Sequence, residues 1–328
     1  MNIDIYEYEK KYSFELKPIT QMCGQNIQKK VFILESLRKY FSTYKYRETR
    51  NRWRDNVRID NEQVGRKYFS VVSINGIAEL LNMIKLSKQG LMINYIKQLT
   101  QKFDWQLHLR TIDEELEEMF RFMNGEINKL GNIELTYEEA DIWEMVQKSN
   151  VMGMNQMILE DVNNYDLLVI FLNLIKEIMK IEPQKMLVII ENIDHLISTK
   201  EYIDVLKKIN NISVKYDIYF ILSTSLEGYV VCEKELCDGI IIWGDEDFQM
   251  PKMSELLTYI QNNYPYNKKF SDEQLQKDLT SIMHKICSEK YLMNVEENVI
   301  CKMINQTLML HEKWSGTENM LEIAFLNS

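Results

Sequence analysis

Apolar and polar side chains alternate in two short stretches near the beginning of the chain. Residues 3–8 (IDIYEY) and 12–16 (YSFEL) have the two-residue period of half-buried strands, which a hairpin could join. Residues 18–26 (PITQMCGQN) predict a loop that contains a single glycine. From Lys29 to Tyr44 the apolar residues have helical spacing, so the expected order is strand, loop, helix.

Three short apolar runs in the second half of the chain predict buried strands. Residues 186–190 (MLVII), 218–222 (IYFIL) and 239–243 (GIIIW) are rich in β-branched and aromatic side chains, as in strands covered on both faces. Residues 68–74 predict a further strand, and residues 202–216 predict a helix between the first two runs. Strands that alternate with helices indicate a doubly wound or RecA-like parallel sheet.

The remaining apolar patterns have helical spacing, most clearly between Ile112 and Leu130, where the apolar positions share one face. Further helices are predicted at 77–109 with a break near Gly90, at 155–180, and near 252–263, 271–290 and 294–313. Ser271 and Gln274 have the spacing of a capping box at the start of the helix at 271–290. A short strand is predicted at 133–137. The predicted organisation is an α/β head at 1–75 and 150–250, a helical leg at 76–149 with an acidic turn, and a helical C-terminal extension at 251–328.

Composition and charge exclude several classes of protein. The most apolar stretch, Leu167 to Ile175, is too short to span a bilayer, and the first residues lack the apolar core of a signal peptide. The five cysteines have no metal-site spacing, so reduced, mostly buried thiols are expected. We therefore expect a cytoplasmic protein. Its net charge of −10 argues against a uniformly basic surface but not against a local one.

The predicted strand, loop and helix at 12–44 stand where a phosphate-binding loop belongs. Such a loop has the pattern G-x-x-x-x-G-K-[ST], in which backbone N–H groups cradle phosphate and the lysine reaches it. If Lys29 takes the lysine position, Cys23 and Gln28 replace the glycines and Lys30 replaces the hydroxyl residue. Shifting the frame does not restore the motif.

The MLVII strand resembles the second nucleotide motif, in which a carboxylate at the strand end holds magnesium. Glu191 stands in place of the usual Asp, and Asn192 in place of the usual catalytic Glu. These substitutions favour a P-loop architecture that has lost hydrolysis. An ordinary α/β sheet that never bound nucleotide comes second, and an active ATPase is least favoured.

An arginine-rich segment at 38–67 contains ten basic residues and four acids, an excess of six positive charges. Arginine suits phosphate because its planar fork donates two hydrogen bonds at once. The segment could instead be a solvated face, or could pair with acids elsewhere, but its excess favours phosphate contact that ignores base sequence. With nearby lysines, the candidate DNA-binding residues are Lys29, Lys30, Arg38, Lys45, Arg47, Arg50, Arg52, Arg54, Arg58, Arg66, Lys85 and Lys88.

An acidic segment at 111–144 contains eleven acids and only two bases. Glu134, Glu138, Glu139 and Asp141 gather around a predicted turn, and carboxylates clustered in this way are relieved by a hard cation such as calcium. The same pattern is explained equally well by a helix N-terminus, where acidic side chains are stabilising.

No catalytic constellation is evident, so no enzymatic activity is expected. The histidines at 108, 195, 284 and 311 are far apart and have no ligand partner three or four residues away. Asp194 and His195 follow a buried strand, but a loop histidine with satisfied hydrogen bonds explains them better than a catalytic pair does.

Three stretches together resemble the Csn-two family of type II-A CRISPR systems, in its long-form subgroup. They are the strand, loop and helix with Lys29 and Lys30, the segment IELTYEEADIWE followed by an apolar helix and KMLVIIENIDHLISTKEYIDVL, and IIIWGDEDFQM. The resemblance implies a RecA/P-loop-like head with degenerate nucleotide motifs, a helical leg and a helical extension. It also implies a homotetrameric ring that binds the ends of double-stranded DNA, is stabilised by calcium and does not hydrolyse ATP.

The same resemblance implies a role in spacer acquisition alongside the CRISPR integrase pair and the type II effector nuclease. It places calcium at Glu134, Glu138, Glu139 and Asp141, although Thr136 replaces an acid found in short members. Two alternatives stay open from the residues alone. One is a DNA-dependent ATPase of the RecA or AAA class, and the other is a protein-interaction scaffold without DNA contact.

Overall fold

The protein is described by a computed structural model, which covers residues 1–42, 53, 55–88, 90–131, 133–136, 146–244, 246–265, 270–286 and 293–307. The chain divides into two compact units. The first contains Met1–Ile77 and Pro183–Ser328, and the second contains Ala78–Glu182.

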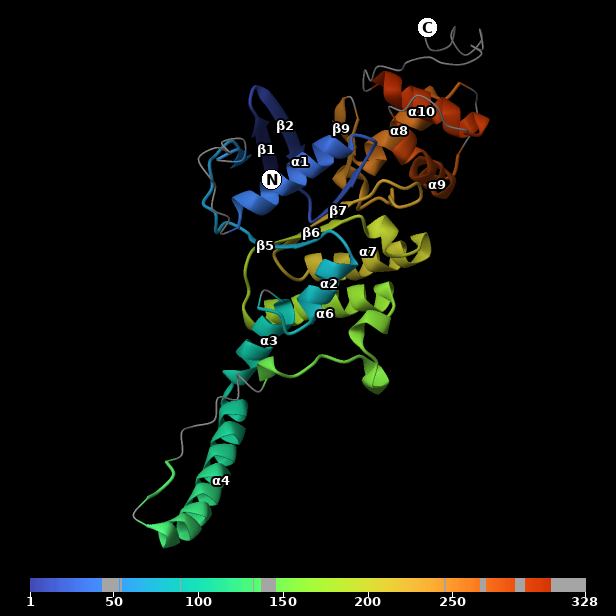
Figure 1. The fold of residues 1–328 in the computed structure, drawn as a ribbon. Helices are drawn as coiled ribbons and strands as arrows, with labels where there is room; N and C mark the ends of the chain where they lie inside the picture. The colour runs from blue at the N-terminus through green and yellow to red at the C-terminus, as the bar shows by residue number, and fades with distance from the viewer. Residues whose placement is uncertain are drawn as a thin grey trace. The chain divides into compact units, whose positions relative to one another are not determined.

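The first unit is built on a mostly parallel sheet in the order β5-β6-β7-β3-β8-β9 (Figure 1). Its strands are β3 (Ile19–Cys23), β5 (Ser70–Ile74), β6 (Met186–Glu191), β7 (Ile218–Ser223), β8 (Ile240–Trp243) and β9 (Asp247–Gln249). Neighbours pair in parallel from β5 to β8, and β9 is antiparallel to β8. The parallel sheet expected from the three apolar runs is therefore confirmed.

A second, antiparallel sheet has the order β2-β1-β4. The predicted hairpin is confirmed, with β1 (Asn2–Glu7) paired to β2 (Lys10–Glu15), and β4 (Val57–Ile59) adds a strand that the pattern does not predict. Ile3, Ile5 and Phe14 from this sheet share one apolar cluster with residues of α1 and of the large sheet.

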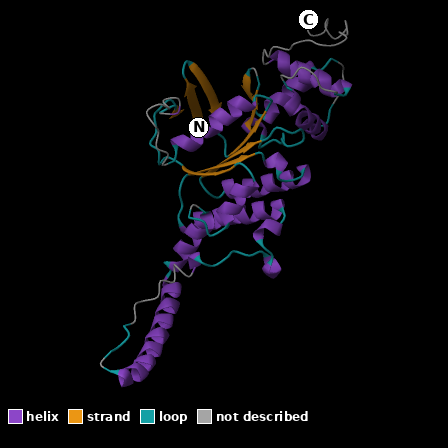
Figure 2. Ribbon diagram, in the orientation of Figure 1, coloured by secondary structure: helices purple, strands orange, loops and turns teal. Residues whose placement is uncertain are grey.

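Helices cover both faces of the large sheet in the first unit (Figure 2). They are α1 (Ile27–Tyr40), α7 (Thr199–Ser213), α8 (Met253–Asn263), α9 (Asp272–Ile282) and α10 (Val295–Thr307). Because strand side chains alternate, Met22 and Trp243 meet α1 in one cluster, whereas Cys23 and Ile242 meet α8, α9 and α10 in another. The C-terminal helices therefore help to cover the sheet.

The second unit is helical. It contains α2 (Ile77–Ile84), α3 (Leu91–Thr100), α4 (Phe103–Ile127) and α6 (Asn164–Ile181). Helix α3 lies beside α6, and Gln98 Nε2 donates to Glu182 Oε2 over 2.7 Å at their ends. The long α4 has no buried residue.

Several predicted boundaries are wrong. Residues 19–23, which were assigned to a loop, form the central strand β3. Ile133–Thr136 was assigned to a strand but forms no strand. The helix predicted from residue 155 begins at Asn164, after short 3₁₀ turns, and the helix predicted from Ile112 begins at Phe103. Ser271 caps α9 as predicted, because its hydroxyl accepts from Gln274 N. Among the described helices, none is both long and apolar enough to cross a membrane.

Candidate functional site: the position of a phosphate-binding loop

The turn from β3 into α1 is held tightly against the end of β8. Gly24 follows β3 with a φ of +92°, and a Cβ at this position would lie 2.4 Å from the carbonyl oxygen of Trp243. Asn26 N donates to the same oxygen over 3.0 Å. Only glycine fits this backbone conformation and close approach.

Because β3 ends at Cys23, the structure places the degenerate motif one residue later than the frame based on Lys29. Gly24 then takes the first glycine position and Lys30 the lysine position, while Lys29 replaces the second glycine and Val31 the hydroxyl residue. The motif is closer to a phosphate-binding loop than the sequence suggests, but two of its essential residues are still missing.

Helical backbone takes the place of the phosphate cradle. Helix α1 begins at Ile27, immediately after Asn26, whose side-chain oxygen accepts from Lys29 N over 3.0 Å. In a working loop these residues are non-helical and turn their N–H groups toward phosphate. Here the asparagine cap already satisfies one of those donors. Lys29 is also engaged, since its Nζ lies 2.7 Å from Asp247 Oδ1 and 2.9 Å from Gly244 O.

Lys30 points into the protein at the carboxyl end of β7. Its Nζ donates to Thr224 O over 2.7 Å and to Ser225 Oγ over 3.1 Å, and the residue is 2% exposed. Burial lowers the pKa of Lys30, and the nearby Asp194 carboxylate opposes this effect. Asp194 accepts from the backbone N–H groups of Ser225 and Leu226 through Oδ2. A buried amine and a buried carboxylate thus occupy the phosphate position.

His284, from the C-terminal helical segment, completes this polar cluster. Its Nε2 lies 3.4 Å from Thr224 Oγ1, and the residue is 4% exposed. Burial and the nearby Lys30 charge together lower the pKa of His284 to about 4, and the Asp194 carboxylate opposes them. No pattern in the sequence indicates this role, because His284 lies far along the chain from both Lys30 and Asp194.

The carboxylate at the second motif position is paired with a base. Glu191 ends β6, and its Oε1 accepts from Arg38 of α1. In an active nucleotide site this carboxylate holds magnesium. Asn192 follows in a left-handed conformation, with a φ of 54°. His195 is exposed, whereas the buried Asp194 carboxylate accepts from the backbone N–H groups of Ser225 and Leu226.

The predicted DNA-binding residues fall into three groups. Lys29, Lys30 and Arg38 are held by partners within the first unit, and Lys85 is paired with Glu160 within the second. Arg58, Arg66 and Lys88 are exposed, and Arg58 lies 5.1 Å from the Tyr6 ring. Lys45, Arg47, Arg50, Arg52 and Arg54 lie outside the described residues. The structure therefore does not bring the whole candidate set to one surface.

Of the predicted calcium ligands, only Glu134 is described, and its side chain is exposed. Glu138, Glu139 and Asp141 lie outside the described residues. Within the described part of the chain, no group of three or more His, Cys, Asp or Glu side chains is arranged to hold a metal ion.

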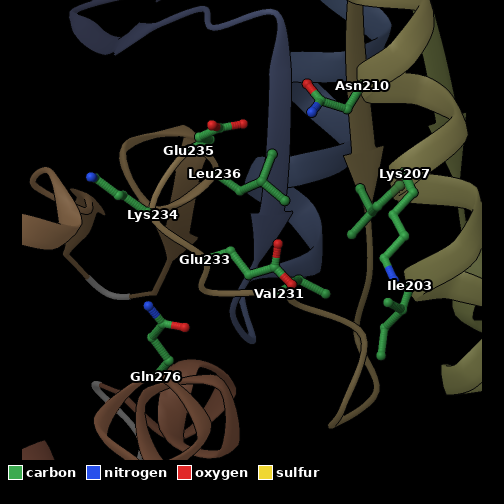
Figure 3. Close-up of a pocket in the computed structure, with 10 residues that line it drawn as sticks. Ile203, Lys207, Asn210, Val231, Glu233, Lys234, Glu235, Leu236 and Gln276 are labelled. Carbon is green, nitrogen blue, oxygen red and sulfur yellow. The ribbon is translucent and has the colours of Figure 1, made fainter. Parts of the chain in front are cut away.

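A pocket of about 360 Å³ opens between α7, α9 and the segment 231–236 (Figure 3). Leu206, Val231 and Leu236 provide its apolar side. The charged residues at its mouth carry both signs, as with Lys207 and Glu233. Acids at the mouth disfavour a polyanion, so this pocket is a poor candidate for DNA contact.

Together these observations define an α/β protein with a mostly parallel sheet, in which buried side chains fill the space beside the turn from β3 into α1. Residues 5–317 match the family model described as CRISPR-associated protein Csn2 subfamily St. The match spans nearly the whole chain, so the chain belongs to the CRISPR-associated Csn2 family, as the resemblance in the sequence indicated.

A solved structure has a similar fold over the full length. It is titled "Crystal structure of Stu0660 of Streptococcus thermophilus", and it aligns with a TM-score of 0.86 at 21% sequence identity over 99% of both chains. At this identity the likeness shows a shared fold. No curated protein matches the chain.

Proposed function

We propose that this protein binds double-stranded DNA without reading its sequence, as a ring-shaped homotetramer that acts in CRISPR spacer acquisition. Membership of a CRISPR-associated family supports the setting. The observation that carries DNA binding is the arginine-rich segment, because an excess of six positive charges is concentrated at 38–67 in a chain of net charge −10. Such a local excess attracts phosphate whatever the net charge.

We assign the proposed DNA contacts to a subset of the basic residues. Lys29, Lys30 and Arg38 have partners inside the first unit, so the contact falls to the arginines between Arg47 and Arg54 and to exposed residues that follow them. The exposed Lys67 belongs to the same basic stretch. Contacts of this kind bind the backbone and release counterions, so affinity should fall steeply with salt.

The proposal is tested by gel shift with linear and covalently closed circular DNA of one sequence. A ring that takes DNA ends binds the linear form and not the closed circle. Equal binding to both would refute threading while leaving DNA binding intact. Absence of binding to either form would refute the proposed function itself.

A matched pair of variants tests the assigned residues. Changing Arg47, Arg50, Arg52 and Arg54 to Ala should abolish most binding, and any residual binding should lose up to about 0.9 from its log–log salt slope for each phosphate contact removed. The control removes the same charge from Lys200, Lys207, Lys208 and Lys215, on and just beyond α7. An equal loss in the control would show that net charge matters rather than the segment.

We further propose that the first unit derives from a RecA/P-loop-like architecture and has no ATPase activity. Counting only the parallel strands in chain order, the sheet reads 2-3-4-1-5, with the strand before the degenerate loop at its topological switch point. The helical backbone from Ile27 and the burial of Lys30 support the loss of nucleotide chemistry. DNA-stimulated ATP turnover that Glu191→Gln abolishes would instead establish the ATPase alternative.

Calcium remains part of the proposal. Four carboxylates at Glu134, Glu138, Glu139 and Asp141 form an all-oxygen donor set, the chemistry that calcium prefers, and Glu134 is exposed. Light scattering with calcium and with a chelator is the direct test, and a particle mass that does not respond would refute a role in assembly. The integrase pair and the effector nuclease remain the proposed protein partners, in the cytoplasm.

A further inference from the structure

Two buried thiols lie side by side at the end of the segment that borders the pocket. Cys232 and Cys237 are both 0% exposed, and the Cys232 thiol donates to Cys237 Sγ over 3.6 Å. Neither is in a disulfide. This pair is independent of the proposed DNA contacts and of the phosphate position.

The backbone that carries the two cysteines is fixed on either side. Gln21 of β3 holds Val231 through both its N–H and its carbonyl oxygen, each over 2.9 Å. Cys232 N donates to Thr280 Oγ1 of α9. Between the cysteines, the chain makes a turn in which Glu233 O accepts from Cys237 N over 2.9 Å. These hydrogen bonds therefore hold the backbone in the position that brings the two sulfurs together.

From this geometry we infer that Cys232 and Cys237 form a redox modification site, in which a hydroperoxide converts the thiol pair into a disulfide. A disulfide has an S–S bond of about 2.05 Å, so the sulfurs must approach by roughly 1.5 Å. Neither sulfur lines the pocket in Figure 3, but their chain neighbours Val231 and Leu236 do, so hydrogen peroxide is expected to reach the buried thiols when this segment opens locally.

The chemistry balances with hydrogen peroxide as the oxidant. The Cys237 thiolate attacks one peroxide oxygen, the O–O bond breaks, and Cys237 becomes a sulfenic acid as hydroxide leaves. Cys232 then attacks the sulfenic sulfur, and the S–S bond forms as water leaves. Overall, two thiols and one peroxide give one disulfide and two waters. We assign Cys237 as the first nucleophile because its sulfur is the acceptor of the hydrogen bond from the Cys232 thiol.

The disulfide would fix the segment between the two cysteines. This segment contains Glu233, Lys234 and Glu235 at the pocket mouth and Leu236 in its wall. Closing so short a loop should make the locally opened form of this segment up to about 40 times less populated. Oxidation is therefore expected to slow amide hydrogen exchange at Leu236 and Cys237 severalfold and to leave exchange in β1 and β2 unchanged.

Peptide mapping tests the inference on the full-length native protein. After treatment with hydrogen peroxide and blocking of free thiols, trypsin cleaves after Lys234, between the two cysteines. The disulfide then joins peptides 216–234 and 235–252 into a species lighter by two hydrogens than their sum, which dithiothreitol separates. Changing buried Cys301 to Ala is the matched control and should leave this species unchanged.

The single-cysteine variants identify the order of attack. In Cys232→Ala, Cys237 should remain as a sulfenic acid that dimedone labels, whereas the unmodified chain should give little label because Cys232 resolves it. Cys237→Ala should give neither label nor linked peptides. Linked peptides that form only after urea denaturation, or links to Cys23 instead, would overturn the inference, and thermal melting would exclude unfolded variants.

Discussion

Acidification is expected to destabilise the first unit through one buried histidine. Burial lowers the pKa of His284 to about 4, with Lys30 adding to the effect and Asp194 opposing it, compared with 6.5 for an unperturbed histidine. The folded protein therefore keeps His284 neutral over a range in which the unfolded chain binds a proton. Stability from this source is complete above about pH 6.5 and is lost as the pH falls toward 4.

The size of this loss of stability follows from the difference between the pKa of His284 in the unfolded and the folded protein. A difference of one in pKa corresponds to about 1.4 kcal/mol, so the interval from 6.5 to about 4 represents about 3 kcal/mol at most. Part of it is already lost in mild acid, about 2 kcal/mol near pH 5. This is a large fraction of the stability of an ordinary domain.

Urea unfolding at neutral pH and near pH 5 measures this loss in three proteins. The unmodified chain should lose about 2 kcal/mol more than His284→Gln, which cannot take up the proton. His195→Gln removes an exposed histidine and should behave like the unmodified chain. If the unmodified chain and His284→Gln lose stability in parallel, His284 is not held neutral by the fold and the reasoning is refuted.

Three substitutions test the phosphate position by chemical denaturation. Gly24→Ala places a Cβ 2.4 Å from Trp243 O at a φ of +92°, so it should destabilise the fold by at least about 2 kcal/mol, and a smaller cost would contradict the close approach. Arg38→Met leaves the buried Glu191 without its arginine and should lower the stability of the fold by about 3 kcal/mol. Combining it with Glu191→Gln should restore part of this stability. Lys30→Met should cost less than about 1.5 kcal/mol, because it removes a buried charge and preserves most of the volume, and a larger cost would indicate that the lysine is essential to the fold.

The parallel strands with uniform apolar runs could be predicted from the sequence. Residues 186–190, 218–222 and 239–243 are buried except for the half-buried Tyr219, so their composition alone identifies them. The C-terminal helices were also predictable, because their apolar periodicity and the Ser271 cap are local signals. Such elements need no information from distant residues.

The central strand β3 could not be predicted because its polar residues are satisfied by distant partners. Gln21 is 1% exposed, yet its side chain bonds Val231 at both N–H and carbonyl and accepts from the Tyr202 hydroxyl. With Thr20 beside it and Pro18 before it, the segment has the composition of a loop. Because the end of this strand at Cys23 was missed, the frame of the nucleotide motif was placed one residue too early.

The candidate site was only partly predictable because a list of charges does not show which charges already have partners. The sequence identified Lys29, Lys30 and Arg38 as DNA-binding candidates on the same ground as the arginines after Tyr46. In the fold, Asp247, the carboxyl end of β7 and Glu191 take up those three bases.

The proposed DNA contact is therefore assigned to the basic residues that follow α1 in the chain, of which Arg58, Arg66 and Lys67 are exposed. In the first unit, Lys30, Asp194 and His284 pack around Thr224 and Ser225 at the carboxyl end of β7. With Lys30 engaged in this way, we expect contact with a polyanion to depend on the segment that follows α1. A four-arginine variant that still binds linear DNA with an unchanged salt slope would break this link between the packed sheet and the proposed surface.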